Sequence, residues 1–166
     1  MKRAAVDVVN LSMCKDPYDL FQLPHNFNVD LKDLDHRYRT LLQVCHPDRA
    51  LGVDKELYAQ KATAITDAYE VLKSPFKRAV FLLKQQGFDA LHGQPDPSFL
   101  MEMMSLQEDM MEGKNHSHDL QTRQHHLLHL ISQAFEQKKY EEAKGYLQQY
   151  HFITKLGSTS HAIATS

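Results

Sequence analysis

The tripeptide His46-Pro47-Asp48 places an imidazole and a carboxylate two residues apart, with a rigid ring between them. In an active site such a pair could serve as a general base and its orienting carboxylate. That chemistry needs a pocket that excludes water. The flanking sequence instead predicts that the tripeptide lies in an exposed turn between two helices. The chain also has no glycine-rich phosphate loop and no Gly-x-Ser-x-Gly nucleophile motif. We therefore predict a docking surface, no catalytic residues and no enzyme activity.

Histidine is the second residue type that could do chemistry, with 11 copies in the chain. His125 and His129 are four residues apart and would share one face of a helix, and His116, His118 and His126 are nearby. Imidazole binds zinc and nickel, so a histidine-rich metal-binding helical protein is one alternative. However, no His-Glu-x-x-His motif and no cysteine or glutamate at ligand spacing accompanies them. The simpler interpretation is a solvated helix face, with no metal site and no cofactor.

Two segments with helical periodicity flank the tripeptide. The apolar positions before it are Leu31, Leu34, Tyr38, Leu41, Leu42 and Cys45, and those after it are Ala62, Ile65, Tyr69 and Leu72. Their spacing of three or four residues places them on one face of each helix. Pro47 disfavours the helical conformation at His46, so the first helix must end there. The pattern predicts a helical hairpin with the tripeptide at its tip.

Helix start signals recur along the rest of the chain. An aspartate or serine followed by proline is typical of a helix N-terminus, and the pairs are Asp16-Pro17, Ser74-Pro75 and Asp96-Pro97. Asp30 can cap the helix that begins at Leu31. Gly87 and Gly157 are expected to end helices. No segment has the period of a strand, so we predict an all-α fold.

Glycines and prolines between residues 87 and 97 divide the helices into two groups. We expect a flexible N-terminal tail at 1–15, a first domain at 16–87, a linker at 88–97 and a second domain at 98–157. Residues 158–166 are expected to be a disordered tail. Three helices joined by short turns make an antiparallel bundle the simplest arrangement for the second domain.

Charge and cysteine content narrow the possible partners. The formal net charge is −2, so there is no global attraction to nucleic acid or to an anionic membrane. No apolar run approaches the length of a membrane span, and no signal peptide is recognisable. Cys14 and Cys45 are the only cysteines, and Cys45 fits an apolar stripe as a reduced core thiol. These features favour a protein partner and an intracellular setting.

The helix order around the tripeptide resembles that of a J-domain, and several further motifs resemble the HscB family of co-chaperones. They are Ser74-Pro75-Phe76-Lys77-Arg78-Ala79-Val80-Phe81-Leu82-Leu83, Gly87-Phe88-Asp89, Phe99-Leu100-Met101-Glu102 and Phe152-Ile153-Thr154-Lys155-Leu156. The resemblance covers about residues 16–157. It implies an L-shaped pair of an N-terminal J-domain and a C-terminal antiparallel three-helix bundle.

The same resemblance implies a function in iron–sulfur cluster assembly. A family member stimulates the ATPase of a DnaK-type chaperone, HscA, and delivers the iron–sulfur scaffold protein IscU to it. The chaperone-binding residues would be His46, Pro47, Asp48, Arg37, Arg39 and Arg49. Only Cys14 precedes the hairpin, so a cysteine-rich zinc module is not expected and a bacterial cytoplasmic setting is favoured. A general J-domain co-chaperone that delivers other clients to DnaK is the remaining alternative.

By resemblance, the scaffold-binding residues would be Leu100, Met104 and Phe152. Leu100 and Met104 are one helical turn apart and can therefore share an exposed stripe. Phe152 lies off the apolar stripe formed by Tyr140, Ala143, Leu147 and Tyr150, so it is expected to point away from the core. We predict an apolar contact surface on the second domain.

Overall fold

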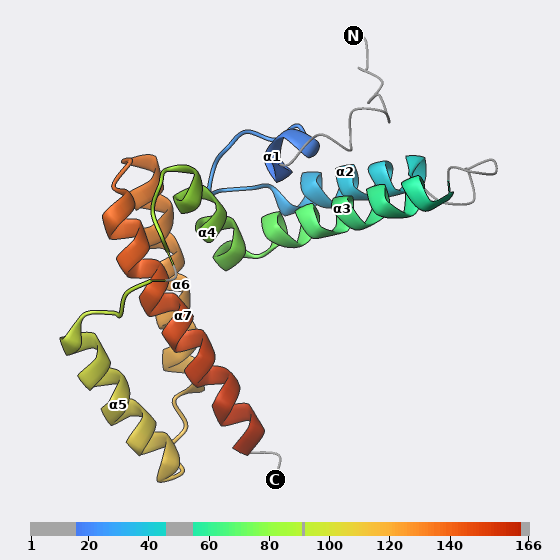
Figure 1. The fold of residues 1–166 in the computed structure, drawn as a ribbon. Coiled ribbons are helices and arrows are strands. Elements are labelled where there is room, and N and C mark those ends of the chain that lie inside the picture. Colours follow the sequence, from blue (N-terminus) through green and yellow to red (C-terminus); the bar gives the residue numbers. More distant parts are fainter. Residues whose placement is uncertain (1–15, 46–54, 91, 164–166) are drawn as a thin grey trace. The chain divides into compact units, whose positions relative to one another are not determined.

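The protein folds entirely as helices in the part of the chain that the structure describes. This is a computed structural model, and it describes residues 16–45, 55–90 and 92–163, with side chains described as far as Gly157. Figure 1 shows α1 (Pro17–Leu20), α2 (Leu31–Val44), α3 (Lys55–Lys73), α4 (Pro75–Gln85), α5 (Pro97–Met111), α6 (Ser117–Glu136) and α7 (Tyr140–Ile163). The predicted all-α class is confirmed.

Contacts divide the chain into two compact units, Met1–Arg78 and Ala79–Ser166, and the division falls within α4. In the first unit, α1 and α2 both pack against α3. The central side chains Leu34, Ile65 and Leu72 are almost completely buried. Tyr18 is also buried, and its hydroxyl donates a hydrogen bond to the carbonyl oxygen of Asn26 at 2.7 Å. Burial of the apolar stripes is thus what pairs the helices of the predicted hairpin.

Three aspartates cap helices as the sequence predicts. The Oδ1 atoms of Asp16, Asp30 and Asp96 each accept a hydrogen bond of 2.8 Å from the backbone N–H two residues later. A cap of this kind satisfies an N–H group that has no partner within the helix. These contacts fix where α1, α2 and α5 begin.

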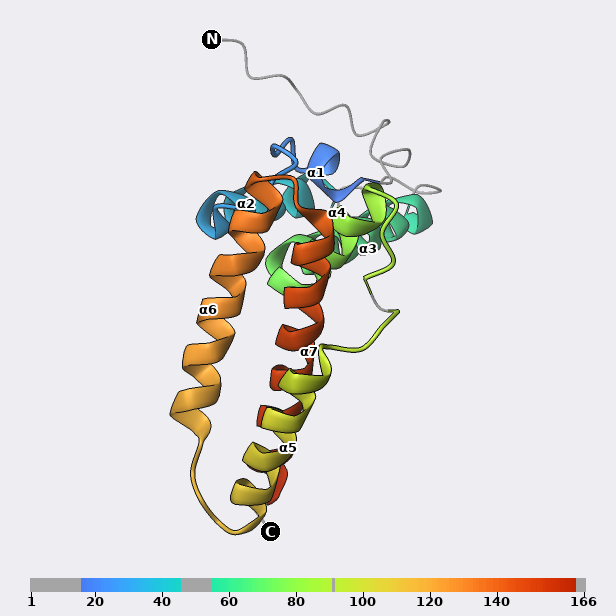
Figure 2. The same cartoon turned by 90° about the vertical axis from the view of Figure 1, so that its left-hand side faces the viewer.

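In the second unit, α6 and α7 form an antiparallel pair, and α5 contacts α7 (Figure 2). The buried residues of this core are Met103, Leu106, Leu120, Leu127, Ile153 and Leu156. A polar contact also joins α5 to α6, because Arg123 Nη1 lies 2.7 Å from Glu102 Oε1. Arg123 Nε binds Asp119 at 3.0 Å within α6. The two carboxylates hold the guanidinium in place across the α5–α6 gap.

The expectation that Gly157 ends the last helix is wrong. Helix α7 continues through Gly157 to Ile163, so a helical segment replaces most of the disordered tail expected at 158–166. A glycine ends a helix when it adopts a left-handed conformation. Gly87 and Gly113 do so with φ of 81° and 89°, whereas Gly157 is not among the positive-φ glycines. Inside a helix, a glycine costs only about 1 kcal/mol relative to alanine, which neighbouring helical residues can offset.

The turn between α6 and α7 places a residue other than glycine in the left-handed region. Lys138 has φ of 57°, and its N–H donates to Phe135 O at 3.1 Å while the next N–H donates to Ala134 O at 2.8 Å. This is the helix-ending arrangement in which glycine is preferred. The conformation is unfavourable for lysine because its Cβ crowds the backbone.

We predict that Lys138→Gly stabilises the second unit by about 1 kcal/mol, because it relieves this crowding. Thermal unfolding followed by circular dichroism measures the change. The matched control is Gln137→Gly, at a position with an ordinary φ of −85°, which should not stabilise the protein. A lower unfolding temperature for Lys138→Gly would contradict the prediction.

Candidate chaperone-binding and scaffold-binding surfaces

The predicted tip residues His46, Pro47, Asp48 and Arg49 lie outside the described residues. The structure does describe the residues directly before this segment, at the end of α2. Helix α2 ends at Val44, and the N–H of Cys45 donates to Leu41 O at 3.0 Å. The Cys45 side chain is fully buried, as predicted, and this burial raises the pKa of its thiol while the positive charge of Lys61 opposes the rise. Cys45 therefore anchors the end of α2 in the core.

A ring contact and a hydrogen bond couple α2 to α3. The rings of Tyr38 and Tyr69 stack with centroids 4.0 Å apart, and Tyr69 donates its hydroxyl hydrogen to Asp35 Oδ1 at 2.7 Å. This hydrogen bond raises the pKa of the Tyr69 hydroxyl, because the phenol must keep its proton to donate it. The two contacts fix the angular position of α2 against α3, and so decide which side chains of α2 face solvent.

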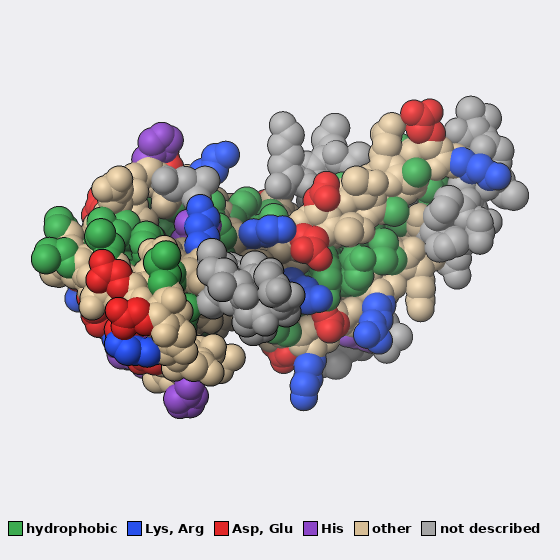
Figure 3. Space-filling model, turned by 90° about the horizontal axis from the view of Figure 1, so that it is seen from below, with side chains coloured by type: hydrophobic (Ala, Val, Ile, Leu, Met, Phe, Trp, Pro, Cys, Tyr) green, Lys and Arg blue, Asp and Glu red, His purple; other side chains and the backbone are tan. Residues whose placement is uncertain are grey.

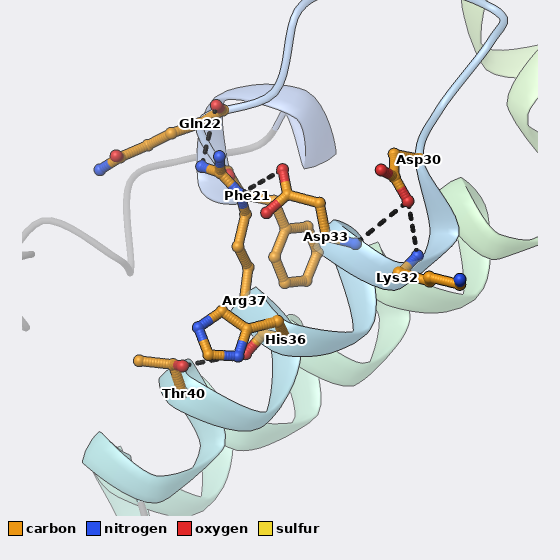
Figure 4. Close-up of polar contacts among 8 residues, drawn as sticks. All are labelled: Phe21, Gln22, Asp30, Lys32, Asp33, His36, Arg37 and Thr40. Carbon is orange, nitrogen blue, oxygen red and sulfur yellow. Dashed lines mark hydrogen bonds and ion pairs between the residues drawn. The ribbon is translucent and has the colours of Figure 1, made fainter.

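Arg37 is tied to the end of α1 (Figure 4). Its Nε binds Asp33 Oδ2 at 2.9 Å, and its Nη1 donates to the carbonyl oxygens of Phe21 and Gln22 at 3.0 and 3.2 Å. Gln22 has a φ of 52°, so the chain reverses sharply where the guanidinium binds it. Asp33 offsets the charge of Arg37. The guanidinium of Arg37 thus has a structural role, because it ties the end of α1 to α2, whereas the sequence predicted only a role in chaperone binding.

Arg39 has a different environment from Arg37. It is exposed, and within the described residues it makes no ion pair. Lys32 and His36 are also exposed, and their spacing of seven and three residues from Arg39 places all three on one face of α2. We name Lys32, His36 and Arg39 the basic face. Of these three residues, only Arg39 was among the predicted chaperone-binding residues, although the i, i+4, i+7 spacing places all three on one face.

The predicted scaffold-binding residues differ in exposure. Met104 is 60% exposed, whereas Leu100 and Phe152 are half-buried. The Phe152 ring contacts Phe99 edge-on, with centroids 6.0 Å apart, and both rings pack against the core of the second unit. Phe152 on α7 therefore lies beside the beginning of α5, where Leu100 follows Phe99. Only part of the Phe152 side chain remains available to a partner, so its outward placement is only partial.

Helix α5 carries two further exposed methionines that were not among the predicted scaffold-binding residues. Met101 and Met111 are 73% and 78% exposed, and Met104 is 60% exposed. Figure 3 shows hydrophobic side chains gathered at the surface over α5, on the left of the view. In contrast, Met103 is fully buried and anchors the opposite side of the helix. The helix thus has an inner apolar side that packs against the core and an outer side on which these methionines are largely exposed. We name Met101, Met104 and Met111 the methionine surface.

The histidines of α6 do not form a metal site with other ligands in the described part of the chain. His118, His125, His126 and His129 are exposed on α6, and no third ligand lies close to them. Among all the described residues, one group of three possible metal ligands has its ligand atoms within 4.8 Å of one another. It lies around α1 and consists of Asp16, Asp19 and His25. His25 Nε2 lies 3.2 Å from Asp19 Oδ1, which is the geometry of an ordinary surface ion pair.

Comparison with known families assigns both units. The DnaJ domain family matches residues 16–81, and the family described as the HSCB C-terminal oligomerisation domain matches residues 95–159. An HscB homolog from Vibrio vulnificus is 35% identical over 155 residues, which is 84% of this chain and 91% of the relative. The chain belongs to the HscB co-chaperone family. The resemblance inferred from the separated sequence motifs is therefore confirmed.

Other HscB proteins agree in sequence and fold. The mouse protein named "Iron-sulfur cluster co-chaperone protein HscB" is 28% identical over 86% of this chain and 66% of its own length. The structure of HscB from Vibrio cholerae has a TM-score of 0.79 at 29% identity, covering 90% of this chain and 98% of that one. Human HscB has a TM-score of 0.82 at 26% identity, covering 91% of this chain and 83% of that one.

Membership of the HscB family settles the broad class of activity. The chain is a co-chaperone with a J-domain and is not an enzyme. A J-domain implies an Hsp70-type chaperone as the partner. Of the helices that the structure describes, none combines the length and apolar character needed to span a bilayer.

The contrast between Arg37 and Arg39 yields a stability prediction. Arg37→Ala should destabilise the first unit by about 1–2 kcal/mol, because two backbone carbonyls lose a charged donor. Arg39→Ala, the matched control on the same helix, should leave stability within about 0.5 kcal/mol of the parent, because an exposed side chain with no ion pair among the described residues contributes little. Urea unfolding of both variants measures the difference, and equal effects would refute the structural role of Arg37.

Proposed function

We propose that this protein stimulates the ATPase of an HscA-like DnaK-type chaperone and delivers an IscU-like iron–sulfur scaffold protein to it. The observation that carries the proposal is the presence in one chain of a DnaJ domain and an HSCB C-terminal domain. The printed name of the mouse relative supports iron–sulfur cluster assembly as the process. Handing the scaffold to the chaperone would promote cluster transfer and so the maturation of iron–sulfur proteins.

In the first step, His46, Pro47 and Asp48 engage the ATP-bound chaperone. Asp48 provides a carboxylate for a basic residue of the chaperone, and the ring of Pro47 limits the entropy lost when the segment binds. The basic face on α2 adds long-range attraction to an acidic chaperone surface. Arg39 and Arg49 supply charge for this attraction, whereas Arg37 acts mainly by holding α1 against α2.

In the second step, the second unit binds the scaffold protein through apolar contacts. Leu100, Met104 and Phe152 form the proposed binding surface at the beginning of α5 and the middle of α7. Their differing exposure supports a division of roles: Met104 contacts the scaffold directly, and the half-buried Leu100 and Phe152 form the base of the contact. Large apolar side chains at an interface centre contribute most of its binding energy.

The proposal needs no cofactor, metal, nucleic acid or membrane, because each step is a protein–protein contact. The bacterial HscB relatives support a cytoplasmic setting. We propose residues 16–87 as the chaperone-activating domain, 88–97 as its linker and 98–157 as the scaffold-binding domain. The alternative of a general J-domain co-chaperone is less well supported, because its clients would not require an HscB-type C-terminal domain.

Charge reversal on the basic face tests the first step. Arg39→Glu should lower the rate of association with the chaperone about threefold to tenfold at low salt, because a peripheral charge steers the encounter. The difference should shrink as salt screens the charges. Stopped-flow association at two ionic strengths measures this, with Lys144→Glu on α7 as the control reversal. An Arg39→Glu effect that is unchanged by salt would rule out steering.

Truncation of Met104 tests the second step without disturbing the core. Met104→Ala should weaken scaffold binding by about 1–3 kcal/mol, measured by isothermal titration calorimetry, because an interface anchor is lost. Stimulation of the chaperone without scaffold should remain. The control is Gln121→Ala, at an exposed position on α6 outside the proposed surface. Leu100→Ala and Phe152→Ala are expected to lower the unfolding temperature as well. Unchanged scaffold affinity in Met104→Ala would show that α5 is not the binding surface.

A further inference from the structure

All the large hydrophobic side chains exposed in the described part of the second unit are methionines of α5. They are Met101, Met104 and Met111, at 73%, 60% and 78% exposure. Met101 and Met104 are three residues apart, and Met111 lies seven residues beyond Met104, so Met104 shares a helix side with each. Met103 lies between the first two in sequence but is fully buried. The same helix therefore contains exposed and protected thioethers.

Exposed thioethers are chemically distinct from other apolar contacts because they can be oxidised reversibly. A hydroperoxide transfers one oxygen atom to the methionine sulfur, its O–O bond breaks, and water or an alcohol leaves. The product, methionine sulfoxide, carries a polar S=O group in place of an apolar sulfur. Burying that oxygen without a donor at an interface is unfavourable, so a contact built on methionine weakens when it is oxidised.

We propose that the methionine surface is part of the scaffold-binding site and that its oxidation by peroxide weakens scaffold binding. Methionine sulfoxide reductases would restore it: two thiols are oxidised to a disulfide, and the sulfoxide oxygen leaves as water. The regulatory role rests on the proposed scaffold-binding function. It extends that site along α5 to Met111 and assigns Met101, Met104 and Met111 as modification sites. Leucine would provide a similar apolar surface without this sensitivity.

The first experiment follows the chemistry alone. The full-length protein is treated with hydrogen peroxide, then with dithiothreitol to reduce oxidised cysteines but not sulfoxides, and the methionines are followed by peptide mass spectrometry. Met101, Met104 and Met111 should be oxidised at least about tenfold faster than Met103, because oxidation follows exposure. Oxidation of Met103 at the same rate as its neighbours would overturn the assignment.

The second experiment measures scaffold binding before and after peroxide. An IscU-like scaffold protein should bind the oxidised wild type at least about tenfold more weakly, which corresponds to one polar group buried at the interface without a hydrogen-bond partner. The comparison protein carries Met101→Leu, Met104→Leu and Met111→Leu. The ratio of the two affinities is compared for each protein, so any effect of leucine on the starting affinity cancels. This ratio should stay below about twofold for the leucine variant, because its α5 surface has no exposed thioether to oxidise.

The outcomes separate the regulatory role from the proposed function. If the untreated protein binds the scaffold and the oxidised protein binds equally well, the regulatory role is wrong and the proposed function stands. If the leucine variant loses as much affinity as the wild type, the oxidised groups lie elsewhere and the assignment to α5 is wrong. If the untreated protein does not bind the scaffold, the proposed function fails and the regulatory role fails with it.

Discussion

The pairing of α2 with α3 is the interaction on which the chaperone-binding half of the molecule depends. Leu34, Ile65 and Leu72 bury the seam between the helices. The Tyr38–Tyr69 stack and the hydrogen bond from Tyr69 to Asp35 then fix their rotation about that seam. Because side chains on a helix are about 100° apart, this rotation determines that Lys32, His36 and Arg39 face solvent. The electrostatic surface is therefore a consequence of core packing.

In the second unit, the apolar residues of helix α5 are divided between two sides of the helix, one buried and one exposed. Met103 and Leu106 are buried, whereas Met104 is mostly exposed. A helix that binds a partner must remain anchored when that partner leaves, and the buried side together with the Glu102–Arg123 ion pair provides the anchor. The outer side can then present apolar groups without loss of the fold. Flexible methionine side chains suit such a surface because they adapt to the shape of a partner.

Local signals in the sequence predicted the helices well, whereas contacts between distant residues were not predictable. Asp16, Asp30 and Asp96 cap helices as expected, because a cap depends only on neighbouring residues. Arg37 reaches carbonyls 15 and 16 residues away, and no periodicity indicates such a contact. The expectation that Gly157 ends α7 was wrong for another reason: a glycine allows a left-handed conformation but does not enforce it. Exposure along α5 likewise required knowledge of which side α6 and α7 cover.

The central claim is that the chain acts on an Hsp70-type chaperone through the tip of the α2–α3 hairpin. The most direct test is the steady-state ATPase rate of an HscA-like chaperone with wild-type protein and with His46→Gln, without scaffold. Circular dichroism serves as the control for folding. The proposal predicts that His46→Gln folds normally and gives no stimulation at concentrations that saturate the wild type. Stimulation equal to that of the wild type by a folded His46→Gln protein would contradict it.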